Sequence, residues 1–126
     1  MGQCYFVDAE LSYKDKRGAE DALDGFLKGI LESGGRLDAP AGYVPGAGTA
    51  GMDVLMRALL TDRGCRKTGE NMYQAEFDAT YSWETVMYDA FRAMAPYLAD
   101  AACMDIYPDS GAVRLIAGEM RGRAGA

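Results

Sequence analysis

The sequence predicts an α+β domain in which two or three helices cover one face of a four-stranded antiparallel sheet. Two segments, residues 5–13 and 73–81, alternate strictly between apolar and polar side chains, as in strands that are buried on one face only. Two others, residues 19–33 and 83–94, repeat apolar side chains every three or four positions, as in amphipathic helices. The 126 residues, 49% hydrophobic and 25% charged, are sufficient for one folded domain.

In the first half of the chain, we expect a strand at residues 5–13, followed by the helix at 19–33. Gly34-Gly35 should end this helix, because glycine readily adopts the backbone conformation that terminates a helix. Residues 36–51, rich in proline and glycine, are expected to form a loop, and a shorter helix should follow at about residues 52–63.

In the second half, the strand at residues 73–81 leads directly into the helix at 83–94. Residues 104–107 and 112–116 are predicted to form a C-terminal hairpin, because Pro108-Asp109-Ser110-Gly111 between them is a favourable turn sequence.

The expected element order is therefore β-α-α-β-α-β-β. Residues 1–121 should form a single α+β domain, and residues 122–126 a disordered tail. Each predicted strand is apolar on one side only, so the helices must all pack on the same face of the sheet. A ferredoxin-like sandwich, or a variant of it, is the arrangement that satisfies this pattern.

The absence of histidine excludes Ser-His-Asp and Cys-His nucleophiles and any imidazole metal ligand. Cys4, Cys65 and Cys103 are far apart and form no Cys-x-x-Cys motif, so we expect neither structural zinc nor thioredoxin-type chemistry. The sequence also shows no signal peptide and no apolar run long enough to cross a bilayer. We therefore expect a cytoplasmic protein that has no membrane partner and needs no cofactor.

The negative charge is concentrated in one part of the chain. The net charge is −6, and residues 68–109 carry eight acidic residues against Arg92 alone, a net charge of −7 for that segment. An acidic surface repels nucleic acid and attracts basic partners, so direct binding of DNA or RNA is not expected.

Acidic side chains occupy the polar face of both long strands. Asp8 and Glu10 share that face in the first strand, and Glu76 and Asp78 share it in the second. If the strands are neighbours, four carboxylates gather on the open side of the sheet, where like charges directly opposite one another are destabilising. With two acids of the hairpin added, the candidate partner-binding residues are Asp8, Glu10, Glu76, Asp78, Asp105 and Asp109.

Three interpretations of this acidic face remain open. It is a solvated strand face, a docking surface for a partner rich in Arg or Lys, or the magnesium site of a small carboxylate enzyme of phosphoryl-transfer type. The docking surface is our leading functional hypothesis, with no catalytic and no metal-binding residue assigned. The metal-dependent enzyme is the alternative, although only Arg92 in the acidic segment could hold a phosphate. A homo-oligomer assembled through exposed strand edges is a further possibility.

Two other motifs offer chemistry. Residues 46–51 match G-x-G-x-x-G before a predicted helix, whose N-terminal amides could bind phosphate, but no strand precedes them. A flexible loop or a docking loop fits this segment as well. Cys65 lies near Arg63, Arg66 and Lys67, which could lower its thiol pKa, but it has no histidine partner.

Tyr81-Ser82-Trp83-Glu84, Ala95-Pro96-Tyr97-Leu98 and Ile106-Tyr107-Pro108-Asp109-Ser110-Gly111 resemble segments of small accessory proteins of bacterial mobile elements and prophages. Some small acidic proteins of that class, anti-CRISPR proteins among them, inhibit a host nuclease or surveillance complex by occupying its nucleic-acid-binding surface. The resemblance implies a non-enzymatic inhibitor whose partner presents a basic surface, such as a nuclease or a CRISPR surveillance complex. No site residue is carried over from the class.

Overall fold

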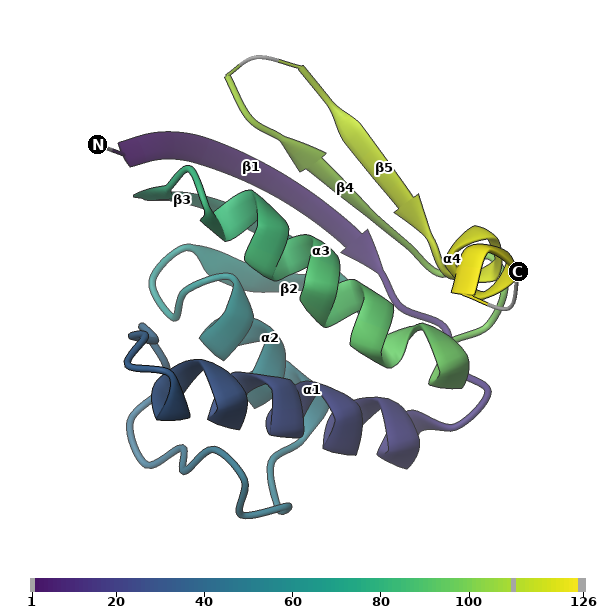
Figure 1. The fold of residues 1–126 in the computed structure, drawn as a ribbon, viewed down its shortest axis with the longest axis horizontal. Helices are drawn as coiled ribbons and strands as arrows, with labels where there is room; N and C mark the ends of the chain where they lie inside the picture. Colours follow the sequence, from purple (N-terminus) through teal and green to yellow (C-terminus); the bar gives the residue numbers. More distant parts are fainter. Residues whose placement is uncertain (1, 110, 125–126) are drawn as a thin grey trace.

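A five-stranded antiparallel sheet with helices packed against one face forms the fold (Figure 1). The computed structural model describes residues 2–109 and 111–124, with side chains as far as residue 121. In chain order the elements are β1 (Gly2–Glu10), α1 (Lys16–Glu32), α2 (Met52–Leu59), β2 (Cys65–Gly69), β3 (Met72–Thr80), α3 (Trp83–Met94), the 3-10 helix η1 (Ala95–Tyr97), β4 (Cys103–Tyr107), β5 (Val113–Ile116) and α4 (Ala117–Ala124).

The strands are arranged in the order β2-β3-β1-β4-β5, and every neighbouring pair is antiparallel. The central strand β1 has β3 on one side and β4 on the other, so segments far apart in the sequence meet along it. Phe6, for example, has Glu76 of β3 as its partner on one side and Tyr107 of β4 on the other.

The predicted α+β class and the antiparallel sheet with its helices on one face are confirmed, but the predicted number of four strands is wrong. The additional strand is β2, which lies between the predicted second helix and the strand at residues 73–81, where neither a helix nor a strand was expected. It is an edge strand in which only Cys65 is buried, while Arg66, Lys67 and Thr68 are exposed. Charged side chains are common on edge strands because they discourage pairing with other chains, so β2 has no apolar alternation to reveal it.

The C-terminal end also differs from the prediction. Helix α4 includes residues 122–124, the first part of the segment that we expected to be a disordered tail, and residues 125–126 lie outside the described residues. No helix in the described part of the chain is long and apolar enough to span a membrane.

The core lies between the sheet and the helices α1, α2 and α3, and the alternation in the two long strands fills it as predicted. In β1 and β3, the odd-numbered side chains are turned inward. The fully or almost fully buried side chains include Tyr5, Val7, Leu11, Leu23, Leu27, Leu55, Tyr73, Ala75, Met87, Phe91 and Met94. The even-numbered side chains of the same strands face the other way, onto a side of the sheet that carries none of the described helices (Figure 1).

Candidate functional site

The uncovered side of the sheet, hereafter the open face, brings together most of the side chains that the sequence analysis proposed as binding residues. Its position follows from the strand register, because residues paired across neighbouring strands project from the same side. The open face includes Cys4, Phe6, Asp8, Glu10, Arg66, Met72, Gln74, Glu76, Asp78, Thr80, Cys103, Asp105, Tyr107, Arg114 and Ile116.

Two rows of side chains cross the centre of the open face at right angles to the strands. In the first row, Phe6 lies between Glu76 and Tyr107. In the second row, Asp8 lies between Gln74 and Asp105, and Asp105 is followed by Arg114 on β5. The aromatic rings therefore lie beside the carboxylates of Asp8 and Asp105 at the middle of the sheet.

The predicted carboxylates share the open face, as expected, but those of β1 and β3 do not lie directly opposite one another. Each faces an uncharged residue across the β1–β3 pair, and the four pairs are Asp8–Gln74, Glu10–Met72, Cys4–Asp78 and Phe6–Glu76. The directly opposed carboxylates in the described sheet are Asp8 and Asp105, across the β1–β4 pair. This staggering reduces the repulsion that directly opposed charges would cause.

Asp105 is the candidate residue whose charge is compensated. The Arg114 guanidinium forms a two-pronged contact with it, with Nε 2.7 Å from Oδ1 and Nη2 3.0 Å from Oδ2. The same contact raises the pKa of Arg114. In the part of the chain with described side chains, Asp8, Glu10, Glu76, Asp78 and Asp109 form no ion pair.

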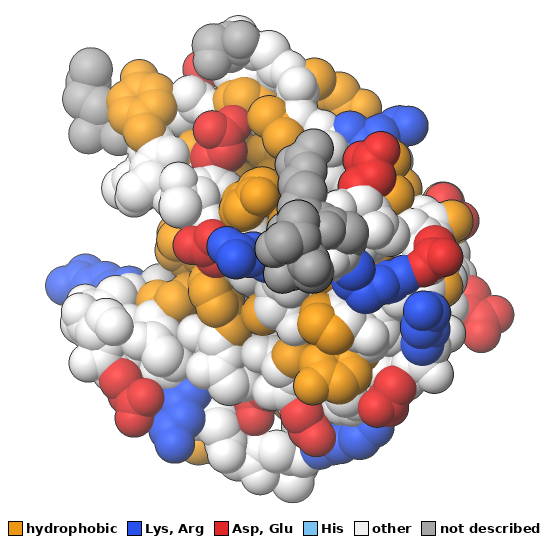
Figure 2. All heavy atoms as spheres, turned by 45° about the vertical axis from the view of Figure 1, so that its right-hand side comes forward, with side chains coloured by type: hydrophobic (Ala, Val, Ile, Leu, Met, Phe, Trp, Pro, Cys, Tyr) orange, Lys and Arg blue, Asp and Glu red, His pale blue; other side chains and the backbone are white. Residues whose placement is uncertain are grey.

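The local negative potential is visible at Cys4, an exposed thiol on β1. Desolvation, together with the nearby carboxylates of Asp78, Glu76 and Asp109, raises the pKa of the Cys4 thiol. Asp109, in the turn after β4, therefore contributes to the same potential as the strand residues. On the side of the molecule that carries α4 the charges are mixed, with acidic and basic side chains interspersed (Figure 2).

The open face lacks the ligand set of a magnesium site. Among the described residues, no group of three or more Asp, Glu, Cys or His side chains is close enough to hold a metal ion. Asp8 and Asp105 form only a pair, and Arg114 already occupies both oxygens of Asp105. The geometry thus gives no support to two-metal phosphoryl transfer.

The glycine-rich loop is bound by an internal carboxylate. Asp24 on α1 accepts hydrogen bonds from Gly46 N at 3.0 Å, Gly48 N at 3.1 Å and the Tyr43 hydroxyl at 2.6 Å. Glu20 likewise accepts from Met52 N, at the start of α2, at 2.9 Å. Because carboxylates of the chain itself occupy the amides that a phosphate would need, the loop is a structural element rather than a nucleotide site.

The surroundings of Cys65 do not favour a reactive thiol. Cys65 is almost completely buried, and this burial raises the pKa of its thiol to about 11 despite the nearby Arg57. The basic residues around it therefore do not create a reactive thiolate.

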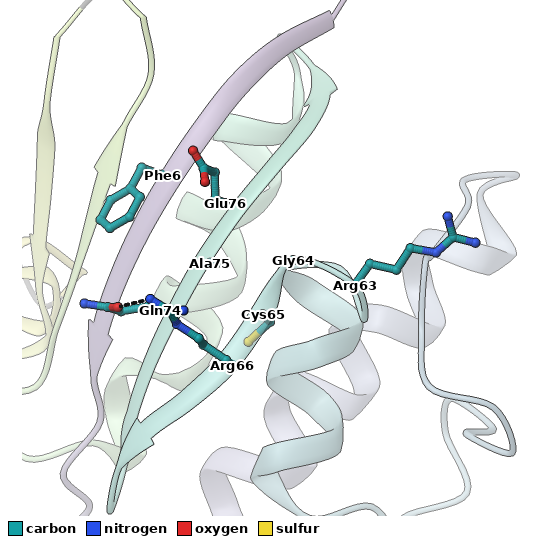
Figure 3. A pocket seen from close by; sticks show the side chains of 8 residues that line it. All are labelled: Phe6, Arg63, Gly64, Cys65, Arg66, Gln74, Ala75 and Glu76. Carbon is teal, nitrogen blue, oxygen red and sulfur yellow. Dashed lines mark hydrogen bonds between the residues drawn. The ribbon is translucent and has the colours of Figure 1, made fainter.

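A hollow of about 290 Å³ opens beside Phe6 and is lined by residues of β3, of the edge strand β2 and of the turn before β2. In Figure 3, Phe6 and Glu76 lie toward one end of the hollow, and Gln74 and Arg66 toward the other. Arg66 Nη2 donates a hydrogen bond to Gln74 Oε1 at 3.2 Å, whereas Arg63 points away. The Arg66 guanidinium thus already forms a hydrogen bond, while the Glu76 carboxylate forms no ion pair with the described side chains.

Two aromatic side chains of the open face, those of Phe6 and Tyr107, were not among the predicted binding residues. Phe6 is 38% exposed and Tyr107 is 40% exposed, and their ring centroids are 5.9 Å apart. A signal for Phe6 was present, because its even-numbered position places it among the polar residues of the alternating strand. For Tyr107 the short hairpin strand contains too few residues to define its inward face.

Comparison of the chain with protein-family models, with curated proteins and with solved structures found no match. What the open face can bind is therefore inferred from its own geometry and charge.

Proposed function

We propose that this chain is a non-enzymatic interaction module whose open face binds a basic surface of another protein. The observation that carries the proposal is the set of carboxylates on a sheet face that no described element covers. Four strand carboxylates, those of Asp8, Glu10, Glu76 and Asp78, form no ion pair with the described side chains. Unpaired like charges gathered on one surface attract Lys and Arg from a partner.

The kind of partner follows from the same charge. Proteins that bind DNA or RNA present basic surfaces to the phosphate backbone, and an acidic sheet can cover such a surface in place of nucleic acid. Together with the resemblance to anti-CRISPR-type proteins, this makes a nuclease or a CRISPR surveillance complex the first partner to test. The module would act as an inhibitor by occupation, and its association should be fast and salt-sensitive.

The fold fits such a role as a variant of the ferredoxin-like sandwich. The strand order β4-β1-β3-β2 and the succession of strands and helices agree with the split β-α-β arrangement of that fold. In this interpretation, α2 is an insertion in the first crossover, and β5 with α4 is an addition at one edge. The open sheet face would then be the natural binding platform, since the helices cover the other side.

The test is competition with nucleic acid on a purified partner complex, such as a CRISPR surveillance complex obtained from the native host. The wild-type chain should displace the target DNA, and the double variant Glu76→Lys/Asp78→Lys should not. A matched control reverses two exposed acids on the helical side, Glu32→Lys/Asp89→Lys, and should displace DNA as the wild type does. Equal competition by the wild type and the Glu76→Lys/Asp78→Lys variant would show that the open face is not the binding surface.

A further inference from the structure

Phe6 and Tyr107 form an exposed aromatic pair at the centre of the open face. They are cross-strand partners on β1 and β4, with ring centroids 5.9 Å apart and an interplanar angle of 55°. About two-fifths of each side chain is exposed, on a face where the strand positions near them are polar or charged except for Cys4. Aromatic side chains that remain exposed together are characteristic of binding surfaces.

Carboxylates lie around this aromatic pair on three strands. Glu76 is the direct partner of Phe6 on β3, while Asp8 and Asp105 form the neighbouring row. Glu76 also borders the hollow beside Phe6, at the end away from the Arg66–Gln74 hydrogen bond (Figure 3). A flat cationic group placed against Phe6 can therefore reach the Glu76 carboxylate. It would not meet the Arg66 guanidinium, which lies toward the other end of the hollow.

We infer that Phe6 and Tyr107 form a stacking platform for the guanidinium group of an arginine of the partner, with Glu76 accepting its hydrogen bonds. The inference deepens the proposed function and rests on it, since it names the side chain that the acidic face recognises. A guanidinium is planar and weakly hydrated, so it can stack on an aromatic ring while its N–H groups donate to a carboxylate. The compact, strongly hydrated ammonium group of lysine uses the charge but gains less from the rings.

The competing occupant is a nucleobase, which also stacks on aromatic side chains of an open sheet. The charge of the face argues against it. A base arrives with its phosphate, and around Phe6 that phosphate would meet Glu76, Asp8 and Asp78, none of which is ion-paired with a described side chain. Stacking would have to overcome this repulsion.

The experiment compares two peptides of equal charge, octa-arginine and octa-lysine, by isothermal titration calorimetry with the full chain at low ionic strength. The wild type should bind octa-arginine about two- to five-fold more tightly than octa-lysine, the preference expected of an exposed cation–π contact. Phe6→Leu and Tyr107→Leu should each reduce this preference, weakening octa-arginine binding more than octa-lysine binding. The control Tyr81→Leu removes an exposed tyrosine beyond the end of β3 and should leave both affinities unchanged.

The outcomes separate the inference from the proposed function. Equal affinities for the two peptides, both lost in Glu76→Lys/Asp78→Lys, would retain the acidic surface and overturn the arginine platform. Failure of the wild type to bind either peptide would overturn the proposed function itself. Tighter binding of a single-stranded oligothymidylate than of octa-arginine, lost in Phe6→Leu, would overturn the inference by identifying a nucleobase platform.

Discussion

Asp24 is a buried acidic residue whose role is structural, in contrast to the acids of the open face. Burial alone would raise its pKa, but the hydrogen bonds from Tyr43, Gly46 and Gly48 outweigh this effect and lower the pKa of Asp24 below its ordinary value. The folded-state pKa then lies below that of the unfolded chain, which is about 3.9. The ionised carboxylate therefore stabilises the fold above that pH, and the contribution is lost as the pH falls through the folded value.

We expect Asp24→Asn to lower the free energy of unfolding at neutral pH by about 1–3 kcal/mol, because amides of the loop lose a charged acceptor. The difference from the wild type should shrink as the pH falls below about 4, where the unfolded chain becomes protonated, and should vanish below the lowered pKa of the folded Asp24 carboxylate. Urea denaturation at a series of pH values measures it. The control Asp21→Asn removes an exposed ion pair with Arg17 and should cost less than about 1 kcal/mol. A difference for Asp24→Asn that stays constant down to the most acidic pH would contradict this role.

The opposed carboxylates of Asp8 and Asp105 lead to a prediction about metal ions. Since Arg114 holds both oxygens of Asp105 and the described residues offer no third ligand nearby, a divalent ion gains little at this position. Millimolar Mg²⁺ or Mn²⁺ should shift the melting temperature no more than NaCl of the same ionic strength. An ion that binds only the folded state would raise the melting temperature specifically, and such a rise would favour the metal-dependent enzyme.

The carboxylates of the open face could be assigned from the sequence because strict alternation determines which side of a strand a residue occupies. What alternation cannot supply is the partner across the sheet. The opposition of Asp8 to Asp105, and the meeting of Phe6 with Tyr107, depend on the position of β4 beside β1. Both contacts join residues nearly the whole chain apart, so no local pattern encodes them, whereas the pairing of Asp105 with Arg114 is a local contact within the β4–β5 hairpin.

At the scale of single elements, α1 contains glycines whose replacement should have opposite effects. A Cβ added at Gly25 or Gly29 would meet no other atom within 4 Å, whereas one at Gly18 would collide with the Tyr97 ring and the Asp15 carboxylate. Gly25→Ala and Gly29→Ala should each raise the free energy of unfolding by about 0.5–1 kcal/mol, because alanine loses less backbone entropy in a helix.

Gly18→Ala is the matched substitution in the same helix and should destabilise the protein, because Asp15 is the N-cap of α1 and its carboxylate accepts from Gly18 N. Guanidinium denaturation of the three variants gives the comparison. If Gly25→Ala or Gly29→Ala proved destabilising, the side of α1 that carries these two glycines would have to contact another molecule.

The predictability of the elements follows from how much apolar surface each one buries. The long strands β1 and β3 and the helices α1 and α3 carry repeated apolar positions, and all four were predicted. The bounds of β3 and α3 agree to within one residue, whereas β1 begins and ends three residues before the predicted strand at 5–13, and α1 begins three residues before the predicted start at residue 19. Strand β2 buries only Cys65, and α2 ends at Leu59 rather than near residue 63. Where few side chains enter the core, tertiary pairing determines the structure, and the local sequence holds little trace of it.

At the scale of the whole molecule, the sheet brings the negative charge of one segment of the chain together on a single face. Strands β3 and β4 both belong to the acidic segment at residues 68–109, and both flank β1, which adds Asp8 and Glu10. The helices occupy the other side, so this charge is neither covered nor, apart from Asp105, paired with the described cations. A face with this composition is expected to cost stability in the free protein and to be retained for what it binds.

Neutralising part of that charge should therefore not destabilise the free protein. The double variant Glu76→Gln/Asp78→Asn removes like charges that form no ion pair with the described side chains, so at low ionic strength its melting temperature should equal or exceed that of the wild type. Added NaCl screens the repulsion, and the two melting temperatures should then converge.

Arg114→Gln should change the melting temperature in the opposite direction, because it leaves Asp105 facing Asp8 without a cation. It should lower the melting temperature most at low salt. Thermal denaturation across a salt series checks both signs. A melting temperature below wild type for Glu76→Gln/Asp78→Asn would mean that these carboxylates stabilise the free fold, and the acidity of the open face would then need no partner to explain it.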